Sequence, residues 1–256
     1  MSEPSDQRPK RRRGCWCAAV FVLMIVGVAC YYAVYSISDA ANRMHCANEI
    51  QQIALAMHCY HQAYGSFPPA YTTDSDGHPL HSWRVLLLPY LSYEELYKEI
   101  RLNEPWDSPH NREVFDKAKN PTHNFHCCSA TNPESETSYV MIVGPNTISD
   151  GPHSVGFGDI KDGSENTIMV VEIKNSGIHW AEPRDLDFAS TSFRINDPNG
   201  KGISSDHPGW AGVAFADGSV RFLADDLDPK LVKALITING GEDVSAFTKR
   251  PNPGHK

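Results

Sequence analysis

The stretch HPGWAGVAFADGSVRFL, from His207 to Leu223, decides the fold because it has the pattern of a β-hairpin. Two alternating runs flank Asp217-Gly218, and an Asp-Gly pair readily adopts the positive φ angles of a tight type I′ turn. A two-residue turn would place the large apolar side chains on one face and the small and polar ones on the other. It predicts the cross-strand pairs Phe215 with Val220 and Val213 with Phe222. His207 precedes a Pro-Gly turn, so its imidazole is expected at the mouth of a half-buried hairpin.

The amino-terminal part of the chain predicts one long helix. Residues 14–38 carry no charge, and this uncharged run is longer than the roughly 20 residues needed to cross a bilayer as a helix. From Met44 to Tyr64, apolar residues recur every three or four positions, as in an amphipathic helix that ends at Gly65. No breaker separates the two parts. The fold expected is therefore α+β, with a long helix whose second half packs on an antiparallel sheet in a pilin-like arrangement.

Charge predicts how this helix is oriented. Five basic residues lie within 1–13, so this tail is expected to be cytoplasmic, with 14–38 as a single inner-membrane anchor, 39–248 as the extracytoplasmic domain and 249–256 as a flexible tail. A cleaved signal peptide is the alternative, but the apolar run is long and lacks a small-x-small site. The part after residue 13 keeps 18 basic and 29 acidic side chains, a net charge of −11. This balance argues against nucleic-acid binding, which needs a basic surface.

The spacing of His207 from Asp217-Gly218 resembles the prepilin-type processing-associated H-x(9)-D-G domain family, a bacterial family of unknown function that is also filed with solute-binding proteins. Other stretches resemble blocks of the same family: RMHCANEIQQIALAMHCYHQAYGSFPPAY, HSWRVLLLPYL, EPWDSPHN, TSYVMIVGP, DGSENTIMVVE, WAEPRDL and NGGEDV. The resemblance implies a pilin-like amino terminus but no catalytic residues. RRRG ending at Gly14 resembles a pilin processing site, whereas the Phe and Glu that follow in pilins are replaced here by Cys15 and Ala19. A lipoprotein site at Cys30 is a further alternative.

Four of the seven cysteines lie outside the apolar segment, in a compartment where disulfides form: Cys46, Cys59, Cys127 and Cys128. Cys46 and Cys59 are thirteen residues apart on one predicted helix, roughly 20 Å, so they cannot pair with each other. Each can reach the Cys127-Cys128 pair. The resemblance favours Cys46 with Cys127, and free buried thiols remain the alternative.

Three groups of side chains are candidates for a binding site. Trp180, Glu182 and Asp185 place an aromatic ring beside carboxylates, a pattern used by glycan-binding clefts and by glycosidases. His207 with Asp217 and Gly218 could form an imidazole–carboxylate pair, although hydrogen bonds within their own loops explain these residues as well. Four acidic residues are weaker candidates for calcium, without the EF-hand pattern: Asp150, Asp159, Asp162 and Glu165.

These observations predict a membrane-anchored, extracytoplasmic, pseudopilin-like protein that acts by binding a solute or glycan, or by assembly with pilus-like or secretion-like partners. The expected partners also include the lipid bilayer, and no cofactor or catalytic residue is expected. The competing hypothesis is an extracytoplasmic hydrolase, a glycosidase or a metal-dependent enzyme, that uses His207 and nearby carboxylates. The two hypotheses differ in whether histidine and acidic side chains converge in a cleft.

Overall fold

The structure is a computed structural model that describes residues 13–118, 122–200 and 202–248. The chain forms two compact units, Met1–Ala41 and Asn42–Lys256. The predicted basic tail, apart from its last residue, and the predicted tail 249–256 lie outside the described residues.

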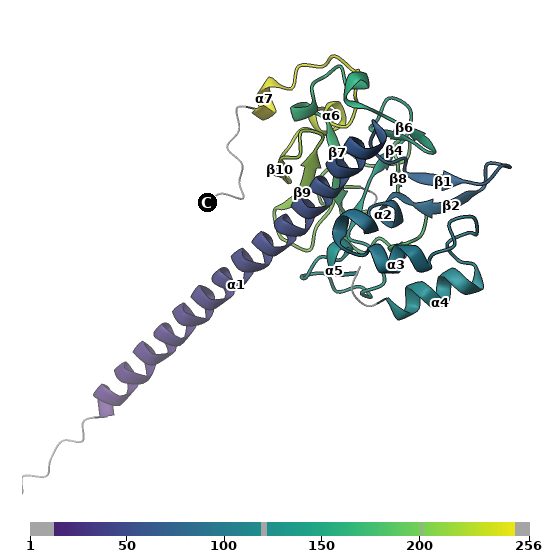
Figure 1. Ribbon diagram of the computed structural model, residues 1–256. Helices are drawn as coiled ribbons and strands as arrows, with labels where there is room; N and C mark the ends of the chain where they lie inside the picture. The colour runs from purple at the N-terminus through teal and green to yellow at the C-terminus, as the bar shows by residue number, and fades with distance from the viewer. Residues whose placement is uncertain (1–12, 119–121, 201, 249–256) are drawn as a thin grey trace, which may run out of the picture. The chain divides into compact units, whose positions relative to one another are not determined.

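Short strands and helices follow one long helix (Figure 1). The α-helices are α1 Arg13–Tyr64, α2 Trp83–Leu86, α3 Glu94–Glu99, α4 Pro109–Lys117, α5 Thr122–Phe125, α6 Pro229–Ala234 and α7 Ser245–Thr248. The strands are β1 Tyr71–Thr73, β2 Pro79–Ser82, β3 Tyr139–Val140, β4 Ile142–Val143, β5 Ser149–Asp150, β6 His153–Ser154, β7 Ile168–Glu172, β8 Leu186–Asp187, β9 Trp210–Phe215 and β10 Val220–Ala224. Short 3-10 helices occupy Leu88–Leu91, Phe157–Asp159 and Ser164–Asn166.

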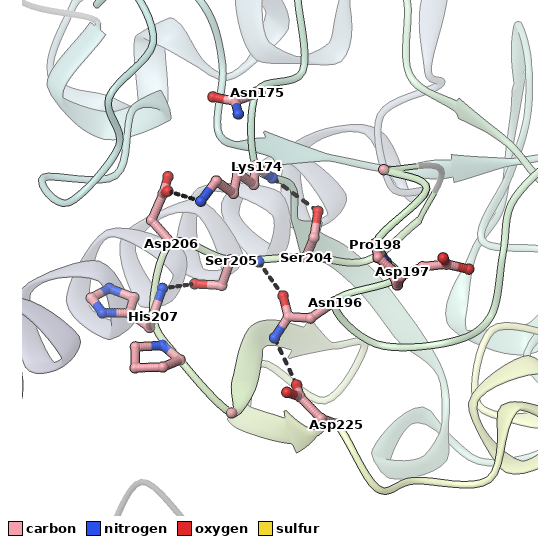
Figure 2. Close-up of a pocket in the computed structure, with 13 residues that line it drawn as sticks. Lys174, Asn175, Asn196, Asp197, Pro198, Ser204, Ser205, Asp206, His207 and Asp225 are labelled. Atoms are coloured by element: carbon pink, nitrogen blue, oxygen red, sulfur yellow. Dashed lines mark hydrogen bonds and ion pairs between the residues drawn. The ribbon is translucent and has the colours of Figure 1, made fainter.

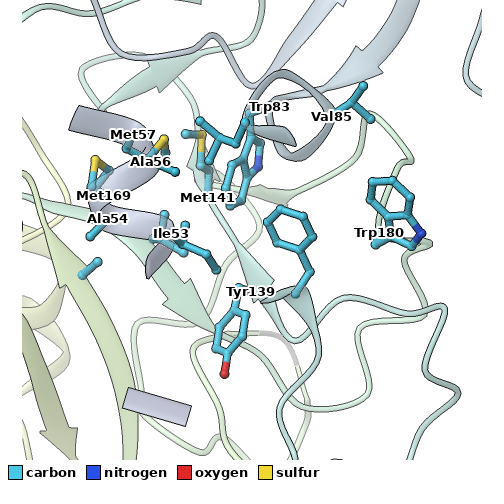
Figure 3. Close-up of a cluster of buried hydrophobic side chains, with 14 of the residues drawn as sticks. Ile53, Ala54, Ala56, Met57, Trp83, Val85, Tyr139, Met141, Met169 and Trp180 are labelled. Atoms are coloured by element: carbon cyan, nitrogen blue, oxygen red, sulfur yellow. The ribbon is translucent and has the colours of Figure 1, made fainter. Parts of the chain in front are cut away.

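Helix α1 has different surroundings in the two units. Among the described residues it is the one helix that is long and apolar enough to cross a membrane. Its most apolar 18-residue window has a mean hydropathy of 2.2, and no residue of that window is buried. In the second unit, its residues Cys46, Ile50, Ile53 and Met57 are buried at helical spacing. This part of α1 shares a hydrophobic core with Trp83, Tyr139, Met141, Met169 and Trp180, as Figure 3 shows.

The main sheet has the strand order β10-β9-β7-β3, and all of its strand pairs are antiparallel. The α+β class predicted from the sequence is confirmed, and so is the hairpin of β9 and β10. The register predicted for the hairpin is wrong by one residue, because Val220 pairs with Ala214 instead of Phe215. Phe215 N donates to the carbonyl oxygen of Ser219 at 2.9 Å, so the loop between these two residues has three residues, and Gly218 takes a left-handed φ of 85°.

Strand β9 is buried on both faces, which corrects the expectation of a half-buried hairpin for this strand, whereas four of the five residues of β10 are only partly buried. Its small residues Gly212 and Ala214 face α1, and the bulky Val213 and Phe215 face a second core that contains α6 and α7. A Cβ added at Gly212 would lie 2.6 Å from Cδ1 of Ile50. The small side chains therefore allow the helix to approach the sheet closely.

The rest of the domain departs from a purely antiparallel plan. A second sheet has the order β6-β5-β4-β8, and β4 pairs in parallel with both β5 and β8. The run from Ser192 to Asn196, whose composition suits a strand, makes only an isolated bridge from Ser192 to Gly202. This run instead turns back at Asn196, which has a φ of 50°, and contributes to the rim of a pocket.

Candidate functional site

A pocket of about 640 Å³ lies beside the amino-terminal end of β9. Figure 2 shows that three separate segments supply its walls. One segment follows β7, one leads into β9 and one follows β10. Nine of the thirteen lining residues have polar side chains and the other four are proline or glycine: Lys174, Asn175, Asn196, Asp197, Pro198, Gly200, Ser204, Ser205, Asp206, His207, Pro208, Gly209 and Asp225.

Unusual backbone conformations shape this pocket. Asn175 and Asn196 both have a φ of 50°, and they are two of the four non-glycine residues with positive φ in the described chain. Such conformations are costly and are concentrated at functional sites. The amide of Asn196 joins the segments, because its Nδ2 donates to Asp225 Oδ1 at 2.7 Å and its Oδ1 accepts from Ser205 N at 2.8 Å.

The described lining has more acidic than basic side chains. Lys174 Nζ lies 2.7 Å from Asp206 Oδ1, and this is an ion pair at the pocket wall. Two further carboxylates, Asp197 and Asp225, line the same space. Hydrogen bonds, above all the one from the Ser192 hydroxyl, hold the pKa of Asp197 below its usual value, so this side chain stays ionised. Among the lining residues that the structure describes, one ammonium therefore accompanies three carboxylates, which favours a neutral or cationic ligand over an anion.

His207 lies between this pocket and a cluster of sulfur atoms. Its backbone N–H donates to Ser205 Oγ at 3.0 Å, and its ring stacks on Trp210 with centroids 4.9 Å apart. The side chain is buried, and Nε2 lies 3.4 Å from Cys46 Sγ and 3.7 Å from Cys127 Sγ. The ring is thus held inside the domain, instead of at an open hairpin mouth as the sequence suggested.

Cys46 and Cys127 form a disulfide, with their Cα atoms 5.5 Å apart. Cys59 and Cys128 are free and exposed. The Cys128 thiol lies 3.6 Å from Cys46 Sγ, so a third sulfur touches the bridge.

Asp217 does not pair with His207. The two residues flank opposite ends of the six-residue strand β9, which spans roughly 20 Å. Asp217 Oδ1 accepts from the backbone N–H and the hydroxyl of Ser219, which fixes the hairpin loop. The Gly218 carbonyl accepts from Gln51 Nε2 at 3.0 Å and ties this loop to α1. Asp217 and Gly218 thus act in the turn, and an imidazole–carboxylate pair is not formed.

The predicted aromatic platform is not available for a ligand. Trp180 is buried and stacks on Phe125 in the core, with a ring distance of 6.1 Å. Glu182 is paired with Arg184 at 2.6 Å. The sequence shows an aromatic ring beside charged residues, but the ring points inward, because α4 and α5 supply the aromatic partners Phe115 and Phe125.

Asp185 is also buried, and its role is structural. Oδ1 accepts from Arg84 Nη1 at 2.8 Å, from Trp83 Nε1 at 3.1 Å and from Met141 N at 2.9 Å. Burial nevertheless raises the pKa of Asp185, while the charge of Arg84 opposes this shift. This network joins α2 to the segment before β8, so Asp185 stabilises the fold and is not part of the pocket in Figure 2.

The calcium candidates are not brought together. Asp162 accepts from the backbone N–H groups of Gly240 and Gly241, and Asp159 Oδ2 accepts from Gly156 N. Within 13–118, 122–200 and 202–248, the groups with metal-ligand spacing are Cys46 with Cys127 and His207, and Asp74 with Asp76 and His78. The acidic residues Asp150, Asp159, Asp162 and Glu165 belong to neither group.

Sequence reasoning missed a second cavity, of about 380 Å³, that contains the carboxyl group of Glu49. Tyr139 donates to Glu49 Oε2 at 2.7 Å, and His45 Nδ1 lies 3.1 Å from Oε1. Burial raises the pKa of Glu49 to about 8, and the negative charge of Glu172 adds to the shift. The polar residues along the helix include this glutamate, but its contact with Tyr139 spans 90 positions and leaves no local signal.

Comparison with known families identifies the chain. One family, described as "Protein of unknown function (DUF1559)", matches residues 36–152 and 174–230, and the chain belongs to it. No curated protein and no solved structure matches the chain. The two matched segments include α1 from the start of its second half, the segments around the pocket in Figure 2, and the β9–β10 hairpin.

Proposed function

We propose that this member of the DUF1559 family is a membrane-anchored binding protein whose extracytoplasmic domain holds a small polar solute in the pocket of Figure 2. The observation that carries the proposal is the pocket itself. Its volume lies within the range of about 300–1,000 Å³ that is typical of small-molecule sites. The solute-binding group in which the family is also filed supports the same function.

The lining indicates the chemical class of the solute. Carboxylates, amides and hydroxyls converge on the pocket, and each can bind hydroxyl or amino groups. None of the described lining residues is Trp, Tyr or Phe, so a sugar would be held by hydrogen bonds and not by stacking on such a ring. In the described lining, three carboxylates and one ammonium favour a cationic or neutral solute, such as an amine, an amino sugar or a polyol.

The apolar part of α1 supports an anchor. Its composition and length suit a membrane span, and a signal sequence passes the same test. The basic residues before this segment favour a cytoplasmic amino terminus in the inner membrane. The pilin-like combination of a long helix and a sheet would also suit assembly partners, but the pocket is the specific feature that favours solute binding.

Binding without catalysis is part of the proposal. The imidazole–carboxylate pair that the sequence suggested for a hydrolase joins His207 to Asp217. Nε2 of His207 instead faces the sulfur atoms of Cys46 and Cys127, and Asp217 lies at the other end of β9. These contacts favour the binding protein over the hydrolase.

The test is a solute panel measured on the full-length protein in mild detergent. Melting temperatures would be compared with amines, amino sugars, neutral polyols and dicarboxylates, and hits would be titrated by calorimetry. We expect binding of cationic or neutral compounds and none of dicarboxylates. Because hydrogen bonds to charged groups contribute about 1.5–3 kcal/mol, Asp206→Asn is expected to weaken a cationic hit about tenfold or more.

Asp107→Asn is the matched control, because it makes the same change in charge at an exposed position outside the pocket. Its affinity for the hit should equal that of the wild type. Equal weakening by both variants would show that the solute responds to the overall charge and not to the pocket. Failure of every compound to raise the melting temperature would remove the proposal.

A further inference from the structure

The two bridged sulfur atoms beside His207 and the thiol of Cys128 form a cluster that the proposed solute site does not use. Cys46 and Cys127 are bridged and almost fully buried, with 1% and 2% of their surfaces exposed. Cys128 is free and exposed, and its thiol lies 3.6 Å from Cys46 Sγ. The buried bridge is thus in contact with an exposed thiol from the adjacent position in the chain.

We propose that this cluster is a thiol–disulfide exchange site in which Cys128 attacks Cys46 and displaces Cys127. Exchange proceeds by attack of a thiolate on a disulfide sulfur, and the 3.6 Å contact between Cys128 and Cys46 places the two reacting atoms together. Cys128 also borders the cavity of about 380 Å³, which gives it access to small thiols from solvent. Cys128 is the route by which such thiols reach the otherwise enclosed bridge.

The step balances without an added oxidant or reductant. Cys128 loses its proton to water, its thiolate forms a bond to Cys46 Sγ, and the Cys46–Cys127 bond breaks with the electron pair leaving on Cys127. One disulfide and one thiol are present before and after the step. Nε2 of His207, 3.7 Å from Cys127 Sγ, is placed to return a proton to the departing thiolate. Because His207 also lines the pocket of Figure 2, that proton can be replaced from solvent.

The probe is reduction of the oxidised full-length protein by glutathione in mild detergent. After exchange, glutathione attacks Cys128 in the Cys46–Cys128 bridge and releases Cys46. A second glutathione then frees Cys128 and leaves as glutathione disulfide. Without Cys128, the Cys46–Cys127 bridge is reached only after local opening, so we expect Cys128→Ser to slow reduction by about tenfold or more.

Two comparisons separate this route from general destabilisation. Treating the native wild type with N-ethylmaleimide blocks Cys128 without a mutation and should slow reduction as much as Cys128→Ser does. Cys59→Ser is the matched control, because Cys59, which lies on α1, is also a free, exposed cysteine. This variant should be reduced at the wild-type rate.

Cys127→Ser provides an independent readout of the attack. Oxidation of this variant should produce a Cys46–Cys128 bridge, which is identified by mass spectrometry of a peptic digest prepared at acidic pH without reductant. The proposal is overturned if Cys127→Ser leaves Cys46 and Cys128 as free thiols. It is also overturned if the Cys128→Ser and maleimide-treated proteins are reduced at the wild-type rate.

Discussion

Replacing Arg84 by alanine should destabilise the domain severely, because this side chain is a fully buried cation with five hydrogen bonds to acceptors. Nη1 lies 2.8 Å from Asp185 Oδ1, and both side chains are almost completely inaccessible to solvent. The guanidinium group also donates to four backbone carbonyl oxygens, those of Tyr139, Trp180, Glu182 and Arg184. Arg84→Ala would leave the carboxylate of Asp185 buried without its cation.

Breaking a buried ion pair on one side costs about 3–5 kcal/mol of the free energy of unfolding. In a domain of roughly 200 residues, each kcal/mol corresponds to about 2–4 °C, so the expected decrease in Tm is about 6–20 °C. The loss depends on pH, because removing Arg84 raises the pKa of buried Asp185 further. A carboxyl group with a raised folded-state pKa destabilises the fold as pH rises above its unfolded value, so the decrease should be smaller at pH 4 than at pH 7.

The assay is thermal unfolding of the full-length protein in mild detergent, followed by tryptophan fluorescence at both pH values. Arg101→Ala is the control, because Arg101 pairs with Glu104 at 3.0 Å on the surface. Exposed pairs contribute about 0–1 kcal/mol, so this variant should unfold close to the wild type. If Arg84→Ala unfolded as Arg101→Ala does at pH 7, the reasoning from burial would be refuted.

Three further predictions concern stability. Because the folded-state pKa of Glu49 is about 8, the free energy of unfolding should fall as pH rises from about 4.5 to 8. Glu49→Gln should therefore flatten a plot of Tm against pH. Parallel plots for the two proteins would contradict this prediction. Gly212→Ala should cost about 1–3 kcal/mol by crowding Ile50, whereas Gly158→Ala, which meets nothing within 4 Å, should cost less in the same urea titration. Cys46→Ser should lose about 4 kcal/mol, because the bridge closes a loop across 81 positions, and an unchanged urea midpoint without reductant would argue against that stabilisation.

Local patterns in the sequence predicted the elements that local chemistry determines. The amphipathic spacing predicted the buried residues Ile50, Ile53 and Met57 of α1, although Met44 and Tyr64 at the ends of the predicted face are exposed. Asp217-Gly218 predicted the hairpin. The register was wrong because Ala216 belongs to the loop, and a three-residue loop with Gly218 at positive φ suits this sequence as well as a two-residue turn does.

The candidate site was harder to predict because its parts come from distant segments. His207 was singled out from the sequence and lines the pocket, but Asn175 and Asn196 gave no local signal of their left-handed backbone. Trp180 and Asp185 were misinterpreted as surface groups. Their burial depends on partners such as Arg84, which is 101 positions away from Asp185 and invisible to any local pattern.

The number of residues between His207 and Asp217 is constrained by packing. Strand β9 fills most of it, with alternate residues directed to a helix on one side and to a second core on the other. Deleting or inserting one residue there would exchange these two sets, so that Val213 and Phe215 would collide with α1. Insertions and deletions in this part of the molecule are therefore tolerated only outside the strand. The number of residues between the imidazole and the turn is fixed by the packing of β9 on both faces.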